Sequence, residues 1–213
     1  MSTEWHSLIK QYRYFAFRAK RASEELLDAA IEVRRRTFRQ EYGASSHIDF
    51  DEYDPTGIHV LAYLGDQAVS SFRINPPGSP CGFELTALAN IRSFPACGPL
   101  VAEASKFAIP PEHRRISAAS FMTLGLIKAA FVIAQLEKFS DYVTWVRPEI
   151  SSIYRIWGFV DIPTLRFGHP NLANLPHQVV RLDLTQFSLC EARKRWVSQI
   201  YHDPVPPNLC LLL

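Results

Sequence analysis

Apolar and polar residues follow helical or alternating spacing through most of the chain, and this pattern predicts an α/β protein. Alternation over residues 14–20 is typical of a strand, and Ser23 followed by two glutamates is a suitable N-cap for a helix that ends at Gly43. Gly65-Asp66, between two apolar runs, indicates a tight hairpin. Further strands are expected at residues 59–64, 68–74, 100–109, 142–146, from 159 onward and at 178–184, and further helices at 117–139, 148–157 and 186–200.

Antiparallel strand pairs come first in this order and βαβ units come later, so we expect a mixed sheet with helices on both faces. Nothing in the pattern suggests a linker or a repeat, and residues 1–213 are expected to form a single domain with a basic segment at 1–22 and a helix and tail at 186–213. Residues 81–99 have no clear pattern. Arg34 stands on the otherwise apolar stripe of the first helix, which the spacing assigns to Leu27, Ile31, Arg34 and Phe38.

The composition is that of an ordinary globular protein, with 213 residues, 47% apolar and 21% charged. These values exclude a mostly disordered chain. The longest apolar run, 121–136, is interrupted by Lys128 and Gln135, so we expect no membrane-spanning helix. The first residues lack the layout of a secretory signal, and we therefore expect a soluble, cytoplasmic protein.

The net charge of +2 is unevenly distributed, because residues 1–40 hold nine basic side chains and five acidic ones. Such an end can attract an acidic partner, such as nucleic acid, an anionic membrane or an acidic carrier protein, or it can simply be a solvated helix face. No docking motif accompanies the charge, so nucleic acid is not an expected partner. A metal site is not expected either, since the cysteines lie at 81, 97, 190 and 210 with no C-x-x-C pair.

Residues 109–119 combine the end of a strand, a basic turn and the start of a helix. The first turn of a helix offers unpaired N–H groups and partial positive charge, which together bind anions such as phosphate. Arg114 and Arg115 add charge, and the small side chains of Ser117, Ala118 and Ala119 allow close approach to the backbone. The same pattern also fits an ordinary basic loop before a helix.

Two motifs resemble those of the GNAT acyltransferase superfamily. Arg114-x-x-Ser117-x-Ala119 is similar to its Arg/Gln-x-x-Gly-x-Gly/Ala phosphate loop, with serine where glycine is usual, and Tyr154-x-x-x-Gly158-Phe159 is similar to its Tyr-x-x-x-Gly-Phe element. The resemblance implies a mixed, mostly antiparallel sheet whose two central strands part to admit a pantetheine arm. It also implies that the pantetheine phosphate is held by Arg114, Arg115, Ser117 and Ala119.

A narrower resemblance lies upstream, on polar residues that core patterning does not explain. The run Arg34-x-x-x-Phe38, Asp49-x-Asp51-x-x-Asp54, Arg73 and Glu103-x-x-Lys106 is similar to that of the acyl-homoserine-lactone synthases, a sister group of the N-acyl amino acid synthases. Lys106 stands where those synthases have arginine, and Ala44 where they have tryptophan. These departures favour an amino acid over S-adenosylmethionine as the amine substrate.

The resemblance implies attack of an amine on an acyl thioester, which requires a group that takes up a proton. Glu103, on an expected strand, is the predicted base, although it could instead be a structural partner of Lys106 or Arg73. Backbone N–H groups near Phe107 are expected to stabilise the oxyanion. The catalytic residues implied are Arg34, Asp51, Asp54, Arg73, Glu103 and Lys106, and the substrate-binding residues are Phe38, Asp49, Ser105, Phe107, Trp145 and Tyr154.

Within this set, Arg34 and Arg73 are expected to hold the acceptor carboxylate, and the three aspartates to hold those arginines or to bind the acceptor amine. Three acids within six residues also suggest a calcium loop, but the spacing of an EF-hand is missing.

The function expected is therefore an N-acyltransferase that moves a long fatty acyl group from acyl carrier protein to the α-amine of an amino acid. Acyl-phosphopantetheine, on the carrier protein or coenzyme A, is then a co-substrate, and no cofactor is permanently bound. The docking face for an acidic carrier is expected at Lys10, Arg13, Arg18, Lys20 and Arg21, and an acyl tunnel at Phe121, Leu124, Leu126, Phe131 and Trp145, which could equally be plain core.

Two alternatives stay open, an autoinducer synthase that uses S-adenosylmethionine and a non-catalytic GNAT-fold protein that binds an acyl carrier. The apolar tail at 209–213 could pack on the core, on a partner or on a membrane surface.

Overall fold

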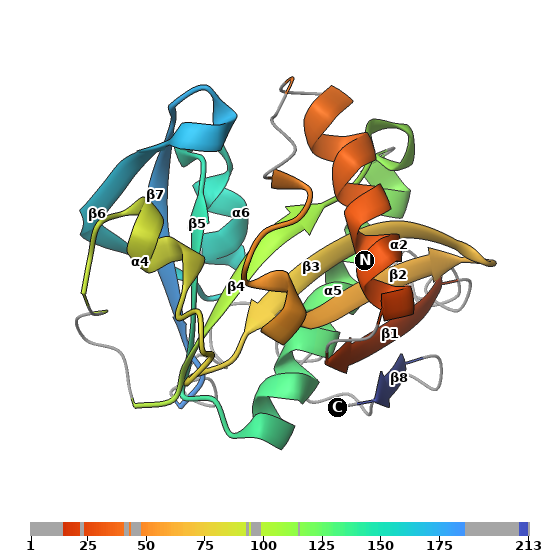
Figure 1. The fold of residues 1–213 in the computed structure, drawn as a ribbon, viewed down its shortest axis with the longest axis horizontal. Coiled ribbons are helices and arrows are strands. Elements are labelled where there is room, and N and C mark those ends of the chain that lie inside the picture. The colour runs from red at the N-terminus through yellow and green to blue at the C-terminus, as the bar shows by residue number, and fades with distance from the viewer. Residues whose placement is uncertain are drawn as a thin grey trace, which may run out of the picture.

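The computed structural model describes residues 15–21, 24–40, 43, 48–92, 94, 99–114, 116–185 and 209–212, some of them, including 116–121, 124 and 209–212, by their backbone alone. The strands form one eight-stranded sheet in the order β6-β7-β5-β4-β3-β2-β1-β8 (Figure 1). They are β1 (Phe15–Arg21), β2 (Ile58–Leu64), β3 (Gln67–Asn75), β4 (Val101–Ala108), β5 (Asp141–Val146), β6 (Val160–His169), β7 (Leu175–Asp183) and β8 (Leu209–Leu212). The helical elements are α2 (Glu24–Arg34), α4 (Glu84–Leu88), α5 (Ile116–Glu137), α6 (Ser151–Ile156), the π-helical η1 (Arg35–Arg39) and the 3-10 turns η3 (Asp54–Thr56), η4 (Pro111–His113), η5 (Pro148–Ile150) and η6 (Pro170–Leu172).

The expected mixed, mostly antiparallel sheet is confirmed. Only the neighbours β4–β5 and β1–β8 are parallel, and the other pairs are antiparallel. The hairpin between β2 and β3 turns at the predicted Gly65-Asp66, where Gly65 has a φ of 61°. That conformation is easy for glycine and matches the two-residue turns that follow the twist of the strands.

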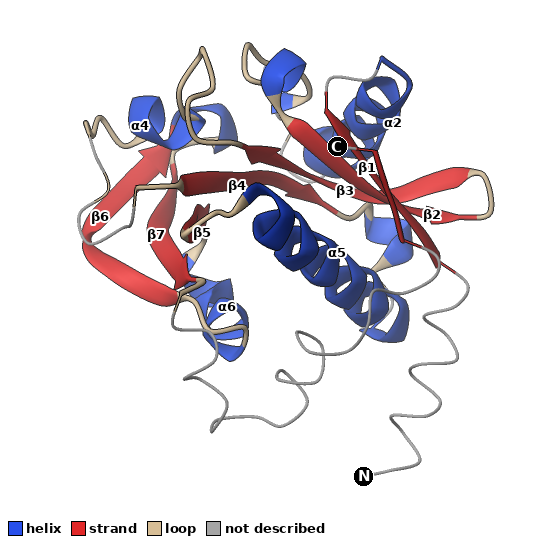
Figure 2. Ribbon diagram, turned by 90° about the horizontal axis from the view of Figure 1, so that it is seen from below, coloured by secondary structure: helices blue, strands red, loops and turns tan. Residues whose placement is uncertain are grey.

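The helices cover both faces of the sheet, as predicted, and alternation along β2 explains why. Ile58, Val60 and Ala62 pack with α5, whereas Leu61 and Tyr63 pack with α2. Figure 2 shows α2 and α5 on opposite sides of the strands. Both faces of β2 are therefore covered by helices, which explains the near-complete burial of the strand.

The buried stripe of α2 differs from the predicted one. Leu26, Ala30 and Val33 are the buried apolar residues, while Leu27 and Ile31 are only partly buried. The sequence pattern predicts the neighbouring stripe through Leu27 and Ile31 instead, because both stripes have helical spacing and share Arg34. Arg34 is fully buried. The helix then widens into the π-helical segment η1. This geometry is rare in proteins, and where it occurs it often lies at a functional site.

The parallel strands β4 and β5 part in the middle of the sheet. They are paired only at Val101 to Glu103, and their later residues no longer face each other in register. On the other edge of β4, the register with β3 shifts, so that Lys106 and Phe107 form a bulge. Lys106 has a φ of 55°, which costs about 1–3 kcal/mol for a residue other than glycine. This strained bulge and the gap beside it position the functional site.

Two described segments were not predicted in this form. The patternless stretch 81–99 contains the short helix α4. The apolar tail, for which three locations were open, supplies β8, whose backbone pairs with β1 at the edge of the sheet. The expected helix at 186–200 and most of the basic segment at 1–22 lie outside the described residues.

The Tyr-Gly-Phe element lies at the end of α6. Gly158 has a φ of 92°, which is accessible to glycine and rarely to other residues, and it turns the chain from α6 into β6. The turn brings the ring of Phe159 edge-on against that of Tyr154, with centroids 5.4 Å apart. The glycine is therefore required by the backbone, and the two aromatic residues stabilise the turn.

Candidate active site

A band of buried polar residues crosses three strands on the face covered by α2. His59 on β2 is in register with Arg73 on β3, and Arg73 is in register with Ser105 on β4. One pair further along, Asn75 faces Glu103. All five side chains are at most 5% exposed. Because burial of unpaired polar groups is costly, their partners determine what this band can do.

Asp54 joins two buried arginines. Its carboxylate accepts hydrogen bonds from Arg34 at 2.7 Å and from Arg73 at 2.8 Å, and all three side chains are fully buried. Burial alone would raise the pKa of Asp54, but the two guanidinium charges outweigh it and lower that pKa to about 2. Arg34 also donates to the carbonyl oxygen of Asp49 at 3.2 Å. The pair of arginines is thus held by the loop that precedes β2.

Lys106 extends this cluster to the bulge. Its ammonium group lies 2.9 Å from carboxylate oxygens of both Asp51 and Glu84. Both carboxylates also bind Arg73, Glu84 at 2.7 Å. Burial would raise the pKa of Asp51, but Arg73 and Lys106 lower it. We call Arg34, Asp51, Asp54, Arg73, Glu84 and Lys106 the charged network; three positive and three negative side chains balance within it.

Glu103 is enclosed by protein groups. One carboxylate oxygen accepts the side-chain amide of Asn75 at 2.5 Å, and the other accepts the backbone N–H of Leu85 at 2.6 Å. Burial, reinforced by the negative charge of Glu84, raises the pKa of Glu103 to about 7. The raised proton affinity expected for this residue is therefore present, but the side chain is fully buried.

Three members of the buried polar band and the charged network were missed from the sequence, namely His59, Asn75 and Glu84. Burial lowers the pKa of His59 to about 4, so its ring is neutral at pH 7. Its Nε2 lies 2.8 Å from the carbonyl oxygen of Asp54 and must donate, which leaves Nδ1 to accept from Arg34 at 3.3 Å. His59 and Asn75 are polar residues at alternate positions of the apolar strands β2 and β3, and this could have indicated them. No pattern predicted α4, which contains Glu84.

Two cavities meet where β4 and β5 part. The first, of about 260 Å³, we call the polar cavity; Phe38, Lys106, Arg114, Trp145, His169 and His177 line it. The second, of about 220 Å³, we call the apolar cavity; Phe72, Ala104, Leu126, Ala130, Phe131 and Tyr142 line it. Both cavities touch Ser105, Phe107, Thr144 and Tyr154. An extended molecule could therefore pass from one cavity to the other between the strands.

The structure brings seven of the thirteen predicted site residues with described side chains to these cavities. Phe38, Ser105, Lys106, Phe107, Trp145, Tyr154 and Arg114 line the polar cavity. Arg34, Asp49, Asp51, Asp54, Arg73 and Glu103 line neither cavity. Among the tunnel residues, Leu126 and Phe131 line the apolar cavity and Trp145 the polar one, whereas the side chains of Phe121 and Leu124 lie outside the described residues.

The predicted phosphate loop is described in part. The turn η4 and the start of α5 at Ile116 follow β4 as expected, and Arg114 donates from Nε to the carbonyl oxygen of Ile109 at 2.6 Å. Arg115 and the side chains of Ser117 and Ala119 lie outside the described residues. Within the described part of the chain, no group of histidines, cysteines and acids could hold a metal ion, and no helix there is long and apolar enough to cross a membrane.

A mixed sheet whose central strands part at a bulge, between a polar and an apolar cavity, has the architecture of the GNAT acyltransferase fold. The family model of the N-acyl amino acid synthase FeeM matches residues 28–183, which is more than half of the chain. The chain therefore belongs to the FeeM family of N-acyl amino acid synthases and is an acyltransferase.

Solved structures share this fold at low sequence identity. FeeM, an N-acyl amino acid synthase from uncultured soil microbes, has a TM-score of 0.65 and 16% identity, with 81% of this chain and 91% of FeeM covered. The acyl-homoserine lactone synthase LasI has a TM-score of 0.63 and 20% identity, with 83% and 94% covered. The CoA-dependent acyl-homoserine lactone synthase BjaI, solved with SAM and isopentyl-CoA, has a TM-score of 0.61 and 19% identity, with 92% and 93% covered.

Proposed function

We propose that this acyltransferase moves a long fatty acyl group from a pantetheine thioester to the α-amine of an amino acid. The observation that carries the proposal is the passage between β4 and β5, which joins a polar cavity to an apolar one. A fatty acyl thioester has the matching division, since its carbonyl group is polar and its chain is apolar. The thioester carbonyl then lies at the passage, beside Ser105 and Thr144.

The donor enters from the side of Arg114, at the start of α5, where its phosphate meets a positive side chain and the N-terminus of a long helix. The acyl chain extends into the apolar cavity between β4, β5 and α5, against residues such as Leu126 and Phe131. Burial of each methylene contributes about 0.8 kcal/mol, so this wall favours long chains over acetyl groups. Backbone N–H groups at the bulge near Phe107 remain our candidates for the oxyanion.

The charged network has a supporting role in this proposal. Arg34 and Arg73 are fully buried, line neither cavity and donate hydrogen bonds to neighbouring protein groups, so the geometry does not favour the predicted contact with an acceptor carboxylate. Lys106 is the member of the network that lines the polar cavity. Asp51 and Glu84 hold its ammonium group, and the acceptor carboxylate then meets a positive charge of fixed position.

The carrier of the acyl group is, in our proposal, acyl carrier protein. Such carriers are acidic, and the excess of basic residues at 1–40 would attract them. Of the proposed docking residues, Lys10 and Arg13 lie outside the described part of the chain, and Lys20 and Arg21 are described by their backbone alone. Arg18 stacks on Tyr63 and lies 3.8 Å from Glu25. Coenzyme A presents the same pantetheine arm, so the two donors must be compared directly.

The test uses purified protein with C12–C16 acyl groups on acyl carrier protein or on coenzyme A, a panel of amino acids and S-adenosylmethionine, followed by mass spectrometry. We expect N-acyl amino acids, formed faster from the carrier protein, with carrier affinity that falls as salt rises. A lactone product would instead identify an autoinducer synthase. No product from any donor, with carrier binding intact, would support a non-catalytic carrier-binding protein.

A matched pair of variants tests the passage itself. Thr144→Leu adds bulk between the cavities, whereas Thr164→Leu makes the same change at an exposed position of β6. We expect the first to lower turnover of long-chain donors strongly and the second to leave it near that of the wild type. Equal turnover in both variants would show that the acyl chain does not use this passage.

A further inference from the structure

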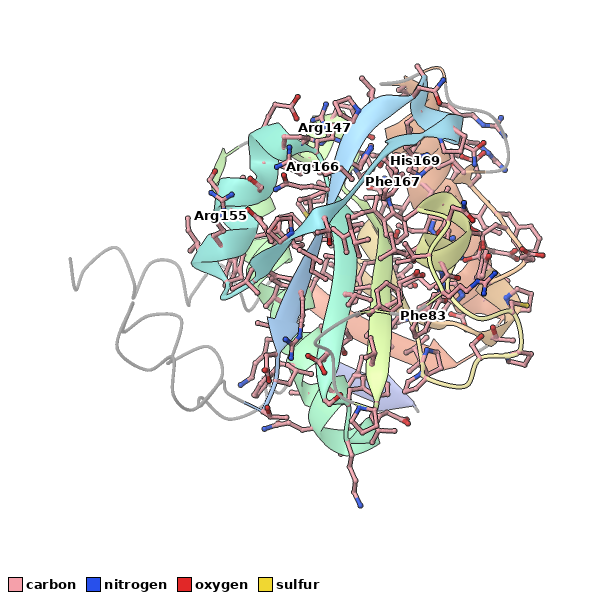
Figure 3. The ribbon with its side chains drawn as sticks, turned by 90° about the vertical axis from the view of Figure 1, so that its left-hand side faces the viewer. Phe83, Arg147, Arg155, Arg166, Phe167 and His169 are labelled. Carbon is pink, nitrogen blue, oxygen red and sulfur yellow. The ribbon has the colours of Figure 1, made fainter. Side chains whose placement is uncertain are left out.

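The proposed reaction needs a group in the polar cavity that accepts a proton from the acceptor amine. Glu103 lines neither cavity, and both of its carboxylate oxygens accept hydrogen bonds from Asn75 and Leu85. The polar cavity has two histidines without an assigned role, His169 and His177, at the ends of β6 and β7 that face each other across η6. Figure 3 shows His169 beside Phe167 on this hairpin, in the same part of the molecule as Arg147.

The ring of His177 is fixed in one tautomer. Its Nδ1 lies 2.8 Å from the carbonyl oxygen of Leu175, which can only accept, so Nδ1 carries the hydrogen. In the neutral ring Nε2 then has a free lone pair. Phe167, its cross-strand partner, stacks on the ring with centroids 5.9 Å apart and planes 22° apart. An imidazole oriented through Nδ1 by a backbone carbonyl has the arrangement of a general base.

His169 supplies a second, independent observation. The residue is 2% exposed, and its Nδ1 is buried without a hydrogen-bond partner among the described residues. Its ring lies 5.3 Å from that of His177 and 6.4 Å from that of Trp145, centroid to centroid. An unpaired buried polar atom is costly, and a polar ligand in the cavity that His169 lines would supply the missing hydrogen-bond partner.

Burial is the main reason why both rings are neutral at pH 7. Burial lowers the pKa of His177, and Arg147 lowers it further, while the Leu175 carbonyl and the exposed Glu149 act in the opposite direction. Burial, then His177 and Lys106, lower the pKa of His169 to about 3. The same positive surroundings disfavour an ammonium ion and favour the neutral, nucleophilic amine.

We propose that His169 and His177 form the acceptor-amine subsite, in which His177 Nε2 takes the proton from the attacking amine. The inference rests on the proposed function. In the step, the amine nitrogen bonds to the thioester carbon, the C–S bond breaks, and the electron pair leaves with sulfur. The proton removed from nitrogen goes to Nε2 and then to the thiolate, so the products are an amide and a free thiol with no change in oxidation state. His169 Nδ1 contacts the same amino acid and positions it.

The kinetic test compares His177→Gln, His177→Ala and Glu103→Gln with the wild type, using whichever acceptor the wild type acylates. We expect His177→Gln to lower kcat by about 10²-fold or more, the usual contribution of a general base. The acid limb of the wild-type profile of kcat/KM against pH should be lost with His177 and kept in Glu103→Gln. Added imidazole should restore part of the turnover of His177→Ala, which a merely structural histidine would not permit.

Turnover that is unchanged in His177→Gln, or an acid limb that is lost only in Glu103→Gln, would overturn the assignment while leaving the proposed function intact. A wild type that acylates no amine would overturn the function instead. Should the variants fail to fold, ¹⁵N NMR of the histidine rings in the wild type decides. The subsite requires His177 to be neutral at pH 7 with its proton on Nδ1, and a charged ring or a proton on Nε2 would refute it.

Discussion

Asp54 is the residue whose replacement should most clearly reveal how the charged network stabilises the fold. Its carboxylate is the shared partner of Arg34 and Arg73, and all three side chains are fully buried. A pKa lowered from 3.8 to about 2 corresponds to about 2.5 kcal/mol of stability at neutral pH. Removing one partner of a buried ion pair typically costs about 3–5 kcal/mol, because the remaining charge is left without compensation. We therefore expect Asp54→Asn to lower the free energy of unfolding by about 3 kcal/mol.

Urea denaturation at several pH values measures this loss. Since the folded protein lowers the pKa of Asp54, its contribution is complete above about pH 4 and fades as the pH falls toward 2. The difference between the wild type and Asp54→Asn should accordingly be constant from pH 8 to 5 and shrink below pH 4. The control is Glu32→Gln, which removes a half-exposed ion pair with Arg35 and should cost less than about 1 kcal/mol. Equal losses in the two variants would refute the reasoning.

Three further changes have definite expected outcomes. Because folding raises the pKa of Glu103 to about 7, wild-type stability should fall as the pH rises from about 4.5 to 7. In urea denaturation the free energy of unfolding of Glu103→Gln should rise relative to that of the wild type by up to about 3 kcal/mol over this range. A difference between the two proteins that does not change with pH would contradict this. Lys106 has a positive φ, so Lys106→Gly should be more stable than Lys106→Ala by about 1 kcal/mol, the reverse of the usual order in a strand, and the same measurement decides. Ala130→Leu fills part of the apolar cavity and should shift product chain lengths, read by mass spectrometry, toward shorter acyl groups; an unchanged distribution would separate this cavity from the acyl chain.

The parts of the fold that the sequence predicted well are those with strong local patterns. The β2–β3 hairpin follows from two apolar runs and a glycine turn, and α5 from a long apolar helix after a basic turn. The helix α4 was missed because five residues contain little more than one helical turn. The strand β8 was missed for another reason: its four residues become a strand only by pairing with β1, almost two hundred positions away.

The candidate site was predictable where polar residues interrupt apolar elements. Arg34 and Arg73 stood out in this way, and both are fully buried. The sequence did not reveal that they line neither cavity, since that depends on the register between strands and on the bulge at Lys106. Nor did spacing distinguish His177 from an ordinary strand residue. Its proposed role is inferred from its hydrogen bond to the Leu175 carbonyl and from the neighbouring ring of His169.

The burial of so many charges beside the cavities is best explained by what it does to Lys106. A lysine with a long, flexible side chain would normally sample many positions and lose entropy on binding a substrate. Here Asp51 and Glu84 hold its ammonium group from two sides, and Arg73 in turn holds both carboxylates. Arg34, Asp54 and Arg73 contribute no atom to the cavity wall, yet they fix the one cation of the network that does. The network therefore turns a flexible residue on a strained bulge into a preorganised charge. Replacing any member of the network should accordingly change both the stability of the protein and the acceptor specificity of the enzyme.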